Sequence, residues 1–350
     1  MPVRVIESID ELDKVRADWD ALAVQRPPME QFSWMRACAE SFTEETRLRV
    51  YVLERDGRAC AIAPLVAHRG GRLETLGVSD LYEPTDLIHQ DRESAEELAC
   101  ALSRSGAGLE FRRMPERTAS VGALRRAYRR RGYVRVQTTD SFPSIALDES
   151  WREPERHFSS RRRSDFRRAM RRAESFGSAR FETLAPTPAE LPQLLAEAFN
   201  VEAAGWKGEG GSALARDRRR GRFFRRYAEL ACEEGRLRLA FMRIAGRAVA
   251  MQYAVEGAGR TWLLKIGYDE RFARCSPGTL LMSHAIGEAA RRNLSSFEFL
   301  GCRESWTDLW TRTETPCVAV RVYPFSAAGF MAFGGDLLQF IFPRWPGFAS

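Results

Sequence analysis

Lysine and histidine are scarce in this sequence of 350 residues, which has three lysines (Lys14, Lys207 and Lys265) and four histidines. Its seven cysteines are odd in number and include no C-x-x-C pair, and the H-E-x-x-H motif does not occur. These absences argue against a disulfide framework, a zinc cage and a zinc protease, so we expect no metal site.

Long apolar segments are also missing. No apolar run reaches the ~18 residues that a membrane-spanning helix needs. The start of the chain is mixed and acidic, without the apolar region of a secretion signal. We therefore expect a cytoplasmic protein. The length and a composition of 44% apolar and 29% charged residues are typical of a globular protein with two domains.

Arginine supplies nearly all of the positive charge, since 51 of the 54 basic residues are arginines. The excess is local: residues 111–135, 151–180 and 216–226 carry net charges of +8, +6 and +6 in a chain of net +7. Such clusters favour an anionic partner, such as cofactor phosphates, nucleic acid or a lipid surface. The alternative for each cluster is a solvated helix face.

The chain contains an internal repeat. The segment from Leu48 (LRVYVLERDGRACAIAP) is similar to the segment from Leu237 (LRLAFMRIAGRAVAMQY), at an offset of 189 residues. Each copy predicts strand, tight turn, strand, and Asp56-Gly57 is a hairpin signal. We expect an α/β (α+β) sandwich with mixed, mostly antiparallel sheets, divided into domains 1–150 and 151–323 and a tail 324–350. In the second domain, the pattern predicts helices over 158–177, 188–204, 216–234 and 278–292 and strands over 261–267, 297–300 and 317–323.

The predicted helix over 158–177 is rich in arginine. Ser159 or Ser160 can cap it and Gly177 can close it. One apolar stripe is made by Phe166, Ala169, Met170, Ala173 and Phe176, and the remaining face carries Arg161, Arg162, Arg163, Arg167, Arg168, Arg171 and Arg172. That face is either solvated or binds phosphate, which guanidinium groups hold in a bidentate manner.

Glu202 lies beside the apolar stripe of the predicted helix over 188–204, at a core-facing position. Burial disfavours the charged form of a carboxylate, which suits a general base; the alternative is exposure at a fraying helix end. Trp206 and Lys207 follow within the run GWKGEGG. Its glycines let the backbone bend around a ligand or form a flexible connector, and Trp206 offers a flat apolar wall.

The strongest local motif is a strand-to-helix turn in KIGYDERFARCSPGTLL. Ser276, Pro277 and Gly278 are typical of a helix start, and Gly278 has no side chain to keep a ligand from the helix amides. Open N–H groups and the helix dipole favour an anion such as pyrophosphate, with Arg271 and Arg274 as counter-charges. The alternative is an ordinary capped helix.

These motifs, in this order, resemble the GNAT acyltransferase superfamily, in which the turn between the fourth strand and the next helix holds the acyl-CoA pyrophosphate. More closely, the chain resembles the two-domain branch named after cellulose-biosynthesis acetyltransferases (CelD-like), which is related to the FemABX peptidoglycan transferases. The matching pieces span residues 1–323 and comprise Trp19…Trp34, Ala63-Pro64-Leu65, the arginine helix, Glu202…Trp206-Lys207-Gly208, Tyr268-Asp269…Ser276-Pro277-Gly278 and Gly301…Trp306…Trp310.

The resemblance implies two tandem GNAT-like domains, the first without a cofactor turn. It implies an N-acyltransferase that uses acetyl-CoA or another acyl-CoA, with direct attack of an acceptor amine on the thioester. Glu202 is then the candidate base, with Asp269 and Glu298 as alternatives. The residues assigned to bind the pyrophosphate are the amides of Ser276, Gly278, Thr279 and Leu280, with Arg271 and Arg274. The residues assigned to the acceptor side are Trp206, Lys207 and Trp306.

Two other functions stay open. An aminoacyl-tRNA-dependent transferase is permitted by the FemABX kinship and favoured by the arginine clusters, which suit tRNA. A non-catalytic module that binds nucleic acid or a membrane surface is less consistent with the Ser-Pro-Gly turn.

The tail 324–350 is apolar, with Asp336 and Arg344 as its only charges. Pro343 and Pro346 interrupt any helix before it could span a bilayer. Helices that lie in a membrane interface carry basic residues, which this tail nearly lacks. We therefore expect it to pack on the protein's own surface or in a homodimer contact, with peripheral membrane contact as the alternative.

Overall fold

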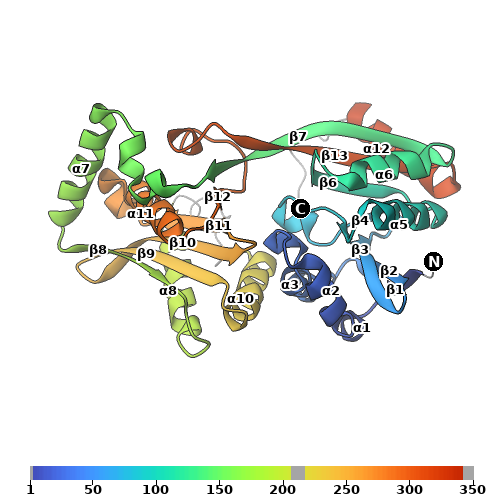
Figure 1. Cartoon of the computed structure of the whole chain (residues 1–350), viewed down its shortest axis with the longest axis horizontal. Coiled ribbons are helices and arrows are strands. Elements are labelled where there is room, and N and C mark those ends of the chain that lie inside the picture. Colours follow the sequence, from blue (N-terminus) through green and yellow to red (C-terminus); the bar gives the residue numbers. More distant parts are fainter. Residues whose placement is uncertain (1–2, 206–216, 342–350) are drawn as a thin grey trace. The chain divides into compact units, whose positions relative to one another are not determined.

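The computed structural model describes residues 3–205 and 217–341, which fall into two compact units (Figure 1). Within these ranges, unit 1 comprises residues up to 24, 29–140 and those from 316 onward, and unit 2 comprises residues 25–28 and 141–315. Residues 316–323, placed in the second domain from the sequence, lie in unit 1 because their strand pairs with a strand of that unit.

Unit 1 is a mixed sheet with helices. Its strands in spatial order are β1 (Val3–Ile6), β2 (Arg47–Arg55), β3 (Arg58–Ala67), β4 (Leu73–Thr75), β6 (Leu109–Pro115), β13 (Glu314–Pro324) and the first part of β7 (Gly132–Ala146), with β5 (Ile88–His89) beside β3. Its helices are α1 (Ile9–Asp13), α2 (Arg16–Ala23), α3 (Phe32–Phe42), α4 (Val78–Leu81), α5 (Arg92–Arg104), α6 (Ala119–Tyr128) and α12 (Ala327–Ile341). The pair β4–β6 is parallel, whereas β1–β2, β2–β3 and β6–β13 are antiparallel.

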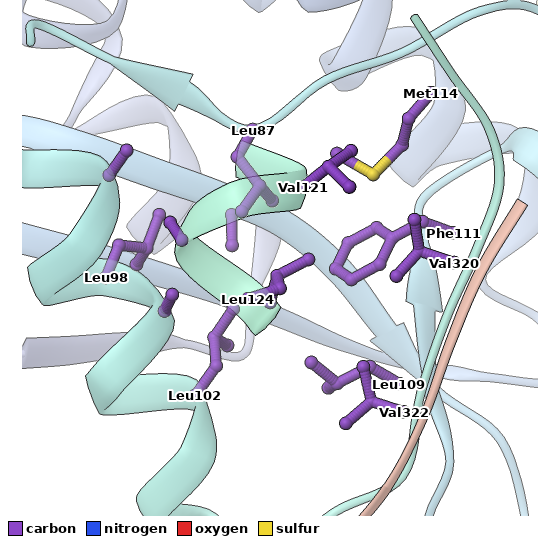
Figure 2. Close-up of a cluster of buried hydrophobic side chains, with 14 of the residues drawn as sticks. Leu87, Leu98, Leu102, Leu109, Phe111, Met114, Val121, Leu124, Val320 and Val322 are labelled. Carbon is purple, nitrogen blue, oxygen red and sulfur yellow. The ribbon is translucent and has the colours of Figure 1, made fainter. Parts of the chain in front are cut away.

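Alternation along β6 and β13 gives the sheet of unit 1 two different faces. Leu109 and Phe111 of β6 and Val320 and Val322 of β13 point toward the apolar residues of α5 and α6 (Figure 2). The residues between them point the other way and are charged or polar. Helix α12 packs on that second face.

Unit 2 is a second mixed sheet. Its strands in spatial order are the end of β7, β12 (Ser296–Glu298), β11 (Arg260–Tyr268), β10 (Arg247–Gly257), β9 (Leu237–Ile244) and β8 (Ala179–Leu184). Only β11–β12 is parallel among these pairs. Its helices are α7 (Ser160–Glu174), α8 (Leu191–Ala203), α10 (Arg218–Glu233) and α11 (Pro277–Arg291), with 3-10 turns η2 (Glu149–Arg152), η3 (Pro154–His157), η4 (Glu270–Cys275) and η5 (Thr307–Leu309).

Helices cover both faces of the sheet in unit 2. Phe166 of α7 and Leu281 of α11 share one apolar cluster with Leu263 and Phe297 of the sheet. On the other face, Tyr253 of β10 contacts Phe224 of α10, and α8 packs on β10 and β11. The predicted sandwich with mixed, mostly antiparallel sheets is therefore confirmed.

The two hairpins of the repeat agree in detail. In β2–β3 the register shifts so that Cys60 has no direct partner, and in β9–β10 it shifts at Val249, which is the same position at the offset of 189 residues. A bulge adds an extra residue and increases strand twist. The two-residue turns also match, since Asp56 and Ala245 have φ of 52° and 49°.

The predicted helices of unit 2 are confirmed to within a few residues at each end. Two features differ from the sequence analysis. The strand β8 (Ala179–Leu184) was not expected, and Phe176, assigned to the buried stripe of α7, is 53% exposed. Phe176 lies past the end of α7, where the helical spacing no longer applies. None of the helices in the described ranges is long and apolar enough to cross a membrane.

Candidate active site

The C-terminal end of β11 is enclosed by α8 on one face and by the start of α11 on the other. A Cβ atom on Gly267 would lie 2.7 Å from Glu202 Cα, and one on Gly205 would lie 2.8 Å from the Tyr268 carbonyl oxygen. A Cβ atom on Gly278 would lie 3.5 Å from the Tyr268 ring. Glycine at 205 and 267 thus lets α8 approach the strand, and Tyr268 borders the helix start.

Asp269 organises the turn that follows β11. Its carboxylate accepts hydrogen bonds from the Arg271 backbone N–H (3.1 Å) and guanidinium (Nη2, 2.6 Å) and from Arg247 (3.1 Å). The hydrogen bond from the Arg271 side chain is the main cause that lowers the pKa of Asp269. A carboxylate held ionised in this way stabilises the turn and is a poor proton acceptor.

Helix α11 begins with a strained residue and one open amide. Ser276 has φ 48° and ψ 51°, a left-handed conformation that is uncommon for a residue other than glycine. Its carbonyl oxygen accepts hydrogen bonds from the N–H groups of Thr279 and Leu280, and its own N–H donates to Ala273. Three of the four amides assigned to pyrophosphate from the sequence are therefore engaged inside the turn. The N–H of Gly278 has no acceptor among the described residues.

Positive charge converges on this helix start. The Arg274 guanidinium is exposed and forms no ion pair with any residue in the described ranges. Arg172 of α7 donates to the Arg274 carbonyl oxygen at 3.3 Å, which fixes the side of α7 that faces the turn. At 100° per residue, Arg168 and Arg161 share that side with Arg172, whereas Arg167 and Arg171 project from the other side.

Glu202 and Glu298 lie on the α8 side of the sheet but at different ends of β11. Glu202 is 1% exposed, beside Gly267. Glu298 is 4% exposed and pairs in register with Trp262, about 20 Å along the strand from Tyr268 at ~3.3 Å per residue. Burial raises the pKa of Glu298, against the lowering effects of the Ser296 hydroxyl and Arg260.

Three predicted residues remain, which are Trp306, Trp206 and Lys207. Trp306 is half-buried in unit 2, donates from its indole nitrogen to Glu304 at 3.0 Å and contacts the Phe299 ring. Trp206 and Lys207 lie outside the described residues, so their assignment to the acceptor stays a prediction. The described ranges contain no group of His, Cys, Asp and Glu side chains that could hold a metal ion.

Gly267 and Tyr268 also line the candidate site, although their residue types alone did not single them out. Gly267 is the next-to-last residue of a strand, where glycine is otherwise unfavourable, and this was the available signal. Tyr268 entered only through the family motif. Burial raises the pKa of its phenol, so the hydroxyl stays protonated at neutral pH.

Comparison with known proteins finds a domain family that matches part of the chain. Residues 160–307 match the acetyltransferase (GNAT) domain family, a stretch that begins at α7 and includes both the α11 turn and Glu202. The chain carries a GNAT acetyltransferase domain. It is accordingly a GNAT-type acyltransferase. No curated protein matches the sequence.

Similar solved structures extend the likeness of fold to the whole chain. FemX is 12% identical, with a TM-score of 0.58 over 97% of this chain and 100% of that one. A tandem GNAT protein from the clavulanic acid biosynthesis pathway is 11% identical, with a TM-score of 0.51 over 92% and 98%. The C-terminal domain of a protein from Agrobacterium fabrum, assigned as a lysylphosphatidylglycerol synthetase, is 11% identical, with a TM-score of 0.55 over 95% and 97%.

Proposed function

We propose that the protein is an acyl-CoA-dependent N-acyltransferase of the CelD-like branch whose active site lies at the C-terminal end of β11. The observation that carries this proposal is the open Gly278 amide at the start of α11, flanked by the exposed Arg274 guanidinium and Arg172. A helix N-terminus with an open amide and arginines suits a diphosphate, and the missing side chain at Gly278 leaves room for it.

In this proposal, an acyl-CoA supplies an acyl group that is activated as a thioester. Gly278, Arg274 and Arg172 hold the pyrophosphate. Ser276 and Arg271 shape the turn through the strained backbone and the Asp269 ion pair rather than by touching phosphate. These roles differ from the sequence-based assignment, in which the amides of Ser276, Gly278, Thr279 and Leu280 all donate to the ligand.

Glu202 is the preferred general base among the three carboxylates. It is buried beside the strand end that the turn also contacts, whereas Glu298 is far along β11 and Asp269 is held ionised by two arginines. Glu202 takes a proton from the acceptor ammonium, and the free amine attacks the thioester carbonyl carbon. The new C–N bond forms as the C–S bond breaks, and CoA leaves as a thiol because its thiolate takes up the second proton that the amine nitrogen loses. Cys275 is buried, and burial raises the pKa of its thiol, which favours this direct transfer over a cysteine-bound acyl group.

The test combines binding and turnover. Calorimetric titration with CoA should show one site, and Glu202→Gln should lower turnover of an amine acceptor ~10²- to 10⁴-fold with CoA affinity intact. Glu298→Gln is the matched control and should change turnover much less. Absence of CoA binding by the wild-type protein would refute the proposal. If Glu202→Gln and Glu298→Gln lose turnover equally, the assignment of Glu202 as the base is wrong, but the proposed use of acyl-CoA still stands.

An aminoacyl-tRNA donor is the second candidate, because the exposed arginines of α7 lie on both sides of that helix. The pair Arg168→Glu with Arg172→Glu, on the turn side, should weaken CoA binding. The pair Arg167→Glu with Arg171→Glu should not. A tRNA ligand would depend on both pairs, and its log affinity would fall with log salt by roughly 0.7–0.9 per phosphate neutralised.

A further inference from the structure

Helix α12 of unit 1 carries an apolar face that nothing in the described ranges covers. The side chains of Phe330, Met331, Phe333 and Leu337 are 68%, 69%, 44% and 47% exposed, and Phe325, just before the helix, is 65% exposed. Single exposed apolar residues are common, but a continuous group of large ones marks a surface that meets an apolar partner.

The helix cannot turn this face inward, because its opposite face is fixed to the sheet. Arg72 donates to the carbonyl oxygen of Ala332 (3.0 Å) and to the carboxylate of Asp336 (2.9 Å), one helical turn further on. The Tyr323 hydroxyl also donates to Asp336, at 2.6 Å. The only charged side chain of α12 is therefore turned toward its own unit, and Phe330, Met331 and Leu337 are exposed on another side of the helix.

Basic and aromatic side chains from another part of the chain border this face. The Phe325 N–H donates to the Arg131 carbonyl oxygen at 2.7 Å, which places the run Arg129-Arg130-Arg131 beside it. Arg129 and Arg130 are exposed and have no ion-pair partner in the described part of the chain. Tyr133, 54% exposed, stacks on Tyr323, whose ring contacts Phe333.

We propose that this surface, formed by Phe325, the exposed face of α12, Tyr133 and the arginine run 129–131, docks on an anionic lipid bilayer. Apolar and aromatic side chains next to arginines are the combination that binds a bilayer interface. The sequence argued against this because the tail lacks basic residues, but the fold supplies them from the α6–β7 turn. A symmetric contact between two copies would instead place the exposed arginines of both copies in one interface, where their desolvation is unfavourable.

The test is sedimentation of the full-length protein with vesicles. The wild-type protein should bind phosphatidylglycerol-containing vesicles, bind pure phosphatidylcholine vesicles more weakly, and be released by salt. Phe330→Ser with Leu337→Ser should lower binding at least about tenfold. Arg129→Ala with Arg130→Ala should lower it about 30-fold, at about fivefold per arginine near an anionic surface. Arg167→Ala with Arg171→Ala, which removes equal charge from unit 2, is the control and should bind as the wild type does.

Circular dichroism and the melting temperature should show that all variants fold, since the altered side chains are exposed. The proposal is overturned if the wild-type protein stays in the supernatant or if the α12 variant sediments as well as the wild type. It is also overturned if light scattering shows a dimer that the α12 variant converts to a monomer without any binding to vesicles. CoA binding tests the proposed activity separately.

Discussion

Substitution of Gly278 should separate the stability of the free protein from its response to CoA. A Cβ atom at this position meets only the Tyr268 ring, at the ordinary contact distance of 3.5 Å. Gly278→Ala should therefore leave the ligand-free protein as stable as the wild type or more stable by up to about 1 kcal/mol, because alanine favours the helix. Gly278→Val adds two methyl groups to that Cβ atom and so places more bulk beside the amide.

The response to ligand should change in the opposite direction. At a CoA concentration of ~100 times Kd, the wild-type protein should gain ~2.7 kcal/mol. Loss of a hydrogen bond to a charged group costs about 1.5–3 kcal/mol, or roughly 10- to 100-fold in affinity. At the same CoA concentration, the gain of the Gly278→Val variant should then fall to about 0.4–1.4 kcal/mol.

Differential scanning calorimetry with and without CoA measures both effects, and it separates the transitions of the two units if they melt independently. Gly122→Ala in α6 is the control, because the atoms nearest to its Cβ would belong to the movable end of the Arg126 side chain. A full CoA-dependent shift in Gly278→Val would contradict this prediction, since the pyrophosphate could not then lie on that amide.

Three further outcomes are expected from the same geometry. Gly267→Ala should lower the free energy of unfolding by about 1–3 kcal/mol and reduce turnover, because its Cβ would lie 2.7 Å from Glu202 Cα; unchanged urea denaturation would contradict that contact. Burial lowers the pKa of His284. The unfolded chain therefore binds more protons below about pH 6.5, and the free energy of unfolding should rise with pH up to that point, less steeply in His284→Phe. Asp269→Asn should loosen the turn and weaken CoA binding measured by calorimetry, whereas a loss of turnover with CoA affinity intact would return Asp269 to the role of base.

The helices of unit 2 were predictable because each buries one stripe against the sheet, so the spacing of apolar residues follows the fold. β8 was missed because Ala179–Leu184 is only partly buried and alternates weakly. The strand β7 (Gly132–Ala146) is continuous, although its two parts belong to different units. The spacing of apolar residues along a strand does not show which other strand it pairs with.

The site was predictable in its residue types but not in its contacts. Ser276-Pro277-Gly278 indicated a helix start, and the structure has one. The sequence could not show that the Ser276 carbonyl engages two of the expected amides or that Arg172, about 100 residues earlier, reaches the turn. Both contacts depend on how the chain folds around the turn and on how α7 packs against it. The spacing of side chains along one helix or strand does not determine either.

The two copies of the repeat differ at the position of the proposed anion site. The two hairpins share their turn and bulge, but the segments after the hairpins differ. In unit 2, a nine-residue strand leads to the 15-residue helix α11, and the Gly278 N–H at its start has no acceptor among the described residues. In unit 1, the three-residue β4 leads to the four-residue α4, too short to hold an anion, and a Cβ on Gly77 at its start would lie 2.5 Å from the buried Cys38 sulfur. We infer that protein side chains, including Cys38, occupy in the first copy the position that the second copy leaves open for a ligand.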